Sequence, residues 1–133
     1  MSQSSSQPNR VESFTAERAA LNNIVAKYAN VEMKRFYGID STAYQAGALD
    51  EKTKELLGFV ASLVLRCDDC ILYHAVGCHK AGVTSAEFME AVSIGMLVGG
   101  SITIPHMRRV VKVWHEELGG QAANDGTEQK ASA

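Results

Sequence analysis

Four residues near the middle of the chain combine types and spacings that could do redox chemistry. The stretch LRCDDCILYHAVGCHKAG (65–82) holds Cys67 and Cys70 three positions apart, then His74 four residues later, then Cys78 after four more. On a helix these positions share one stripe. Cys67 and Cys70 could form a disulfide if Cys67 sits in or just before the first helical turn, and His74 could accept the thiol proton of Cys70. Because a thiolate is the reactive form of cysteine, the residue types indicate a nucleophile, a resolving thiol and a base.

Charges near these thiols act in opposite directions. The N-terminal end of a helix favours a thiolate through the helix dipole. Asp68 and Asp69 suit a first helical turn but oppose the thiolate by like charge, and Arg66 partly offsets them. We expect the acidity of the two thiols to reflect this balance.

A carboxylate could complete the set. Glu55 lies twelve residues before the first cysteine. If the chain reverses between the two helices, Glu55 comes opposite residues 77–80, about one turn from His74 and within reach of a water-bridged contact. The alternative is a solvated helix charge, paired with Lys52 or Lys54.

Two other roles for the segment stay open. The sulfurs and the histidine could belong to the core, and a buried small apolar residue is our interpretation of Cys78. The segment could also hold zinc, with Cys78 or His79 as fourth ligand. Four ligands spread over about 16 Å of one helical stripe cannot close a tetrahedron, so we expect no metal and no cofactor.

The elements around these residues are predicted to be helices throughout, because apolar residues recur at helical spacing and no strand-like alternation is found. Asp50 is expected to cap one helix, Gly82 to end the next, and TSAE (84–87) to open another as a capping box. The expected helices cover residues 14–36, 51–65, 68–82, 85–99 and 105–118. This pattern predicts an all-α fold of about five to six helices.

Length and composition bound the domain and its compartment. The polar ends, 1–10 and 119–133, are predicted to be disordered tails around one helical domain at 11–118. A net charge of −2 predicts neither a nucleic-acid nor a membrane partner. No signal peptide is recognised, and the longest apolar run falls short of the ~20 residues that span a bilayer, so we expect a cytoplasmic protein.

One helix is expected to need a partner chain. The segment AVSIGMLVGG (91–100) is apolar on nearly every side, and such a helix must be buried all round. Self-association into a homo-oligomer would bury it. The alternative is a central helix wrapped by the other four.

Residues 49–92 resemble the carboxymuconolactone decarboxylase-like superfamily, and within it the AhpD-like alkylhydroperoxidases; the likeness extends more loosely through 94–110. The motif that carries it is Glu-x11-Cys-x2-Cys-x3-His, met by Glu55, Cys67, Cys70 and His74. Four positions at three correct spacings are far more specific than a lone Cys-x2-Cys pair.

The resemblance implies an all-helical trimer or hexamer whose substrate is a small hydroperoxide. It implies that Cys70 attacks the peroxide and becomes a sulfenic acid, that Cys67 resolves it to a disulfide, and that a dithiol donor reduces the disulfide. It also implies that His74 and Glu55 relay the proton that activates the thiol.

The chain departs from its relatives beside the second cysteine. Where AhpD-like proteins carry a tyrosine, this chain has Asp69, which should disfavour the thiolate of Cys70. Tyr73 is on the neighbouring helical face and is no evident replacement. A slow peroxidase and a disulfide reductase acting on another oxidant are both compatible with this departure.

Three further histidines lie outside the motif. His106, after a glycine-rich loop, could line the same cleft, with Arg108 or Arg109 drawing anionic substrates; the alternative is the polar edge of an amphipathic helix. His79 and His115 are predicted to be surface residues.

The leading hypothesis is therefore a thiol-dependent peroxidase or disulfide oxidoreductase. A second is a lyase of the decarboxylase branch, in which His74, His106 and Glu55 move protons; the decarboxylases of this superfamily lack the cysteine pair, which disfavours it. A third is a non-catalytic metal-binding or interaction module.

Overall fold

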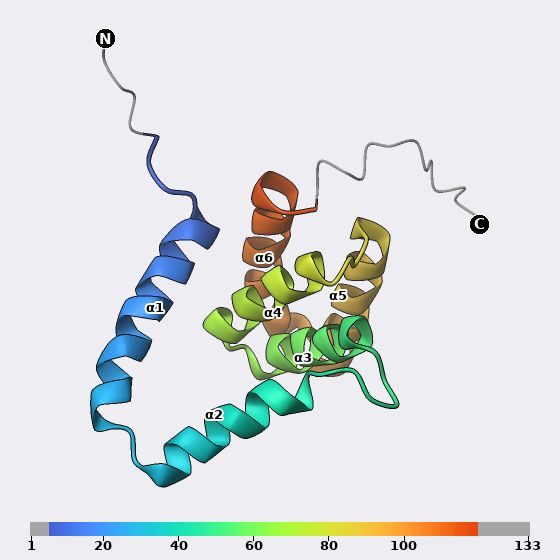
Figure 1. Cartoon of the computed structure of the whole chain (residues 1–133). Helices are drawn as coiled ribbons and strands as arrows, with labels where there is room; N and C mark the ends of the chain where they lie inside the picture. The colour runs from blue at the N-terminus through green and yellow to red at the C-terminus, as the bar shows by residue number, and fades with distance from the viewer. Residues whose placement is uncertain (1–5, 120–133) are drawn as a thin grey trace, which may run out of the picture. The chain divides into compact units, whose positions relative to one another are not determined.

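The computed structural model describes residues 6–119, and in that part of the chain it contains helices and no strand (Figure 1). The all-α class expected from the sequence is confirmed. The elements, in chain order, are α1 (Arg10–Tyr28), α2 (Val31–Ala43), α3 (Glu51–Leu65), α4 (Asp68–Lys80), α5 (Ser85–Gly99), the short 3-10 helix η1 (Ser101–Thr103) and α6 (Ile104–Glu117). None of the helices in this range is long and apolar enough to cross a membrane.

The described residues fall into two units, which meet between Gln45 and Ala46. The single domain expected over 11–118 stays a prediction. The first unit holds α1 and α2, neither of which has a buried residue. Half of the expected tail 1–10 (residues 1–5) and all but the first residue of the expected tail 119–133 lie outside the described residues.

The single helix expected over 14–36 was wrong. It is broken before Asn30, whose side chain accepts a hydrogen bond from the amide of Met33 at 3.0 Å and so caps a new helix. The break expected at 38–41 was also wrong, since α2 continues to Ala43. The boundary between α1 and α2 was missed because the helical spacing of apolar residues continues across Asn30.

The second unit begins and ends its helices where local signals predict. The side chain of Asp50 accepts from the amide of Thr53 at 2.7 Å at the start of α3, and Thr84 forms a capping box with Glu87 at the start of α5. Gly82, two residues beyond the end of α4, has a φ of +85° that favours glycine. Pro105 lies in the first turn of α6.

The core of the second unit lies among α3, α4, α5 and α6. Phe88 stacks on Trp114 with ring centroids 4.0 Å apart, and Phe59 packs 4.8 Å from Phe88. The indole N–H of Trp114 donates to the hydroxyl of Ser85, which donates to the carbonyl of Gly119. The residues of this buried cluster are Phe59, Leu63, Ile71, Ala75, Cys78, Val83, Phe88, Val92, Val110 and Trp114. Gly119 is itself buried, so the packed region extends one residue beyond the expected boundary.

A groove with an apolar lining of α3 and α5 side chains occupies another surface of the second unit. Its volume is about 570 Å³, and it includes Leu57, Val60 and Ile94. At about 100° per residue, this face of α3 is opposite the one that carries Glu55. Leu97 of α5 is 81% exposed. The expected self-association through α5 stays a prediction.

Candidate active site

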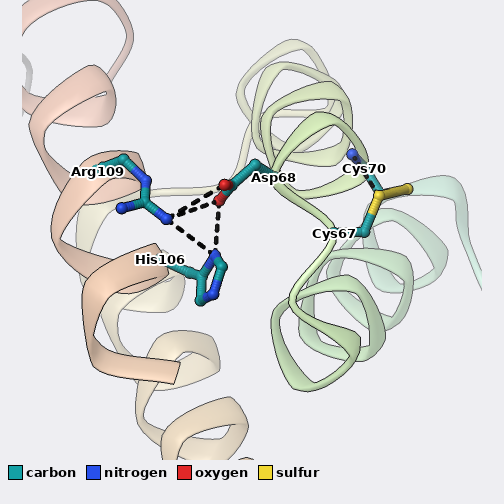
Figure 2. A network of polar contacts seen from close by, with 5 residues as sticks. All are labelled: Cys67, Asp68, Cys70, His106 and Arg109. Atoms are coloured by element: carbon teal, nitrogen blue, oxygen red, sulfur yellow. Dashed lines mark hydrogen bonds and ion pairs between the residues drawn. A yellow bond between two sulfur atoms is a disulfide. The ribbon is translucent and has the colours of Figure 1, made fainter. Parts of the chain in front are cut away.

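The two motif cysteines meet where α3 turns into α4. Arg66 ends α3 in the left-handed conformation (φ 58°), and Cys67 follows in extended backbone as the residue that caps α4. Cys67 and Cys70 form a disulfide, with their Cα atoms 5.2 Å apart (Figure 2). The Cys67 sulfur also accepts the amide hydrogen bond of Cys70, at 3.3 Å between nitrogen and sulfur. The spacing allowed both features: a chain reversal near Arg66, and a disulfide if Cys67 lay in or just before the first turn of the helix.

One helical turn further on, an imidazole and a carboxylate are in direct contact. Nδ1 of His74 in α4 lies 2.9 Å from Oε2 of Glu55 in α3. The two side chains are 12% and 19% exposed, respectively, so the pair is largely shielded from water. From the sequence, Glu55 was either within reach of a water-bridged contact with His74 or a solvated helix charge, whereas the structure brings the two groups into direct contact.

Gly77 explains the close approach of Glu55. A Cβ atom built at Gly77 would lie 2.5 Å from Oε2 of Glu55, closer than real Cβ contacts come. The carboxylate therefore lies directly against the α4 backbone, beside His74. Sequence reasoning missed Gly77, although a glycine inside a helix costs about 1 kcal/mol relative to alanine and so indicates a packing or functional reason.

Two other side chains lie close to the His74–Glu55 pair. The Tyr73 ring meets the His74 ring edge-on, with centroids 5.2 Å apart and planes at 77°, and Tyr73 itself is exposed. Cys78 is fully buried, which confirms its interpretation as a buried apolar residue. Burial, together with the negative charge of Glu55, raises the pKa of the Cys78 thiol to about 12. This thiol is therefore protonated and unreactive at neutral pH.

Asp68, the residue after Cys67, makes a second charged contact, with α6. Nδ1 of His106 lies 2.7 Å from Oδ1 of Asp68, and Nη2 of Arg109 donates to both carboxylate oxygens at 3.2 and 3.3 Å. The same Nη2 lies 3.1 Å from Nδ1 of His106. Partial burial acts to raise the pKa of Asp68, but the hydrogen bonds and charges of His106 and Arg109 outweigh it and hold that pKa below its usual range.

This second contact lies on the other side of the helix start from the disulfide. In Figure 2, Asp68 points toward His106 and Arg109 while the two sulfurs point away from them. The structure joins His106 to Asp68. The sequence had left two places open for His106, the thiol cleft and the polar edge of an amphipathic helix. Asp68 had been interpreted as a charge of the first helical turn that opposes the thiolate, and its link to α6 was missed.

The remaining candidates lie on the surface. Asp69, Arg108, His79 and His115 are all exposed, as expected for the two histidines, and the His79 ring meets the edge of Trp114 at 5.9 Å. Within residues 6–119, no three His, Cys, Asp or Glu side chains gather closely enough to hold a metal ion.

Comparison with known proteins places the chain in a family. The Carboxymuconolactone decarboxylase family profile matches residues 32–113, more than half of the chain, and the chain belongs to this family. The resemblance drawn from the motif is confirmed at this level.

Solved structures of a Thermotoga maritima protein, TM1620, share the fold. Two crystal structures of it align with TM-scores of 0.76 and 0.74 at 50% sequence identity, over 78% of this chain and 91% and 88% of theirs. One of them is described as a "carboxymuconolactone decarboxylase family protein possibly involved in antioxidative response".

Two curated relatives are more distant. "Uncharacterized protein 4 in cox locus" of Paracoccus denitrificans is 27% identical over 81 residues, which cover 61% of this chain and 73% of the relative. "Uncharacterized protein H16_B0147" of Cupriavidus necator is 31% identical over 68 residues, covering 51% of this chain and 60% of the relative. Neither name states an activity.

Proposed function

We propose that this protein is a thiol-dependent peroxidase or disulfide oxidoreductase that reduces hydroperoxides through Cys67 and Cys70. The observation that carries the proposal is the disulfide at the start of α4, one turn before the shielded His74–Glu55 pair. A dithiol, a base and a carboxylate that orients the base are the groups that this chemistry needs. The antioxidative description of the Thermotoga maritima protein supports the same class of reaction.

The oxidative half-reaction has two steps. The thiolate of Cys70 attacks the terminal oxygen of the hydroperoxide, so that an S–O bond forms, the O–O bond breaks and Cys70 becomes a sulfenic acid. The alkoxide that leaves takes up the proton that His74 accepted from the thiol, and an alcohol departs. The Cys67 thiol then attacks the Cys70 sulfur, forms the disulfide and releases water.

The cycle closes by thiol–disulfide exchange. A dithiol donor attacks the Cys67–Cys70 disulfide, passes through a mixed disulfide, and leaves with its own disulfide while both protein thiols are restored. Two electrons and two protons pass from the donor, which balances the two electrons taken by the peroxide. In this scheme Glu55 holds the His74 ring in place and stabilises its protonated form through the 2.9 Å contact.

Replacement of each cysteine tests the proposal. Cys70→Ser should abolish hydroperoxide consumption with dithiothreitol as the dithiol, while the matched control Cys78→Ser should keep it, since Cys78 is buried and protonated. Cys67→Ser should lose the intramolecular disulfide and leave a Cys70 sulfenic acid that only an external thiol can reduce. Mass spectrometry after brief peroxide exposure should show the loss of two hydrogens from the peptide that contains Cys67 and Cys70. Unchanged turnover in Cys70→Ser would refute the assignment. Consumption of carboxymuconolactone that survives alkylation of both thiols would favour the lyase instead.

A further inference from the structure

Asp68, His106 and Arg109 form a charged cluster, here called the Asp68 cluster, that no step of the proposed reaction uses. It links the first residue of α4 to α6 across 38 and 41 positions of sequence. The side chains of Arg109 and Asp68 are 46% and 44% exposed, and surface ion pairs of this kind contribute only about 0–1 kcal/mol to stability. The position of the cluster, next to a redox-active cysteine, suggests a role other than stability.

The Asp68 carboxylate disfavours thiolate formation because Asp68 directly follows Cys67 in the chain. A negative charge at the start of α4 opposes the effect of the helix N-terminus, which favours a thiolate. An uncompensated carboxylate there would therefore make both thiols less acidic. The chain also places Asp69 between the two cysteines, which adds to the same effect.

Contacts within the Asp68 cluster reduce the effect of this carboxylate on the thiols in two ways. Arg109 donates to both carboxylate oxygens, and His106 lies 2.7 Å from one of them, so the charge is compensated at contact distance. The contacts also draw the carboxylate toward α6, away from the sulfurs (Figure 2). With the Asp68 charge compensated and turned away, the N-terminal end of α4 can stabilise a thiolate at the cysteines.

We propose that Arg109 and His106 are positioning residues for the redox pair: by holding and compensating Asp68 on the side away from the sulfurs, they keep the thiols acidic. This inference rests on the proposed function, because it assigns the two residues to the redox chemistry of Cys67 and Cys70. The acidity of the thiols also affects the equilibrium between dithiol and disulfide. Thiolate stabilises the reduced form, so a more acidic thiol makes the disulfide easier to reduce.

Other charged groups act on the same thiols. Asp69 and His74 do so from α4, Glu55 from α3 and Arg66 from the corner that joins these helices; on α6, Arg109 and His106 are the groups in contact with Asp68. The first four are unchanged in every variant below, so their contribution cancels when variants are compared.

The test uses charge changes of opposite sign. In reduced full-length protein, the pH dependence of the iodoacetamide alkylation rate gives the apparent pKa of the more acidic thiol. Arg109→Gln should raise that pKa by about half a unit, a loss of about threefold in alkylation rate below the pKa. Asp68→Asn should shift it in the opposite direction, and Asp68→Asn/Arg109→Gln should return close to the parent value.

Two matched variants separate charge from structure. Arg109→Lys keeps the positive charge and should stay near the parent pKa, and Arg108→Gln, which removes the exposed neighbouring arginine, should also change little. In dithiothreitol redox buffers, Arg109→Gln should shift the equilibrium toward disulfide and Asp68→Asn toward dithiol. A purely structural role would move Arg109→Gln and Asp68→Asn in the same direction.

Equal pKa values in Arg109→Gln, Asp68→Asn and the parent protein would overturn the inference, as would shifts of the same sign. These measurements need no peroxide. If the parent protein fails to turn over hydroperoxide while the opposite shifts are found, the proposed peroxidase activity is wrong and the role of the Asp68 cluster stands.

Discussion

Two carboxylate–imidazole pairs flank the start of α4, and they differ in their surroundings. In the His74–Glu55 pair the side chains are 12% and 19% exposed, and the carboxylate lies against the backbone of Gly77. In the His106–Asp68 pair the carboxylate is 44% exposed and also binds a guanidinium. A shielded pair without bulk water suits the transfer of a proton, whereas an open carboxylate bound to arginine is fixed as an anion. The same two chemical groups thus support different roles because of burial and a third charge.

Replacement of the carboxylates should reveal this difference most strongly. Glu55→Gln should slow the oxidation of Cys70 by about 100-fold, because His74 loses the group that stabilises its protonated form. Asp68→Asn should leave the rate within about threefold of the parent. Single-turnover oxidation of reduced protein by hydroperoxide, followed over a range of pH, measures both. Equal losses in the two variants would show that the pairs are not distinct.

The glycine beside Glu55 gives a second, smaller effect. In Gly77→Ala the new Cβ would overlap the carboxylate, so Glu55 must shift from His74, and we expect a loss of about tenfold in the same assay. Gly38→Ala is the matched control, because it also places alanine in a helix and has no other atom within 4 Å of the new Cβ. A full rate in Gly77→Ala would mean that the position of the Glu55 carboxylate is not required.

The bounds of the helices in the second unit were predictable because helix caps act locally. Asp50 and Thr84 lie within three residues of the amides they bind, so the sequence alone reveals them. The contact of Glu55 with His74 was harder to predict from the sequence, since its length depends on how closely α3 packs on Gly77. The link from Asp68 to α6 was beyond prediction, because it depends on how two helices distant in sequence are packed.

The His106–Asp68 pair should also have a small effect on how the free energy of unfolding depends on pH. A carboxyl with a lowered folded-state pKa contributes its full stabilisation above its unfolded pKa of about 4, and loses it as pH falls through the lower folded value. Because Asp68 is partly exposed, we expect the contribution to be about 0.5 kcal/mol. Asp68→Asn should remove this acid-side loss.

The measurement is urea unfolding at pH 6 and pH 3, followed by the fluorescence of Trp114, the single tryptophan of the chain. The gap in unfolding free energy between parent and Asp68→Asn should be larger at pH 6 than at pH 3. A gap that grows toward pH 3 would contradict the sign.

The third cysteine should show the smallest effect. Cys78 lies near the shielded pair, but its pKa of about 12 leaves about one thiolate in ten thousand at pH 8. Iodoacetamide should therefore label Cys78 in unfolded protein and leave it unlabelled in folded protein, as peptide mass spectrometry would show. Rapid labelling of Cys78 in the folded state would mean that this region opens to solvent.

The Cys67 sulfur changes its redox state in the proposed reaction, and it also accepts the hydrogen bond of the Cys70 amide. A negatively charged sulfur accepts a stronger hydrogen bond than the neutral sulfur of a disulfide. The strength of the hydrogen bond from the Cys70 amide therefore depends on whether the cysteine pair is reduced or oxidised. The NMR chemical shift of that single amide would therefore report the redox state of the cysteine pair during the proposed reaction, without an added dye.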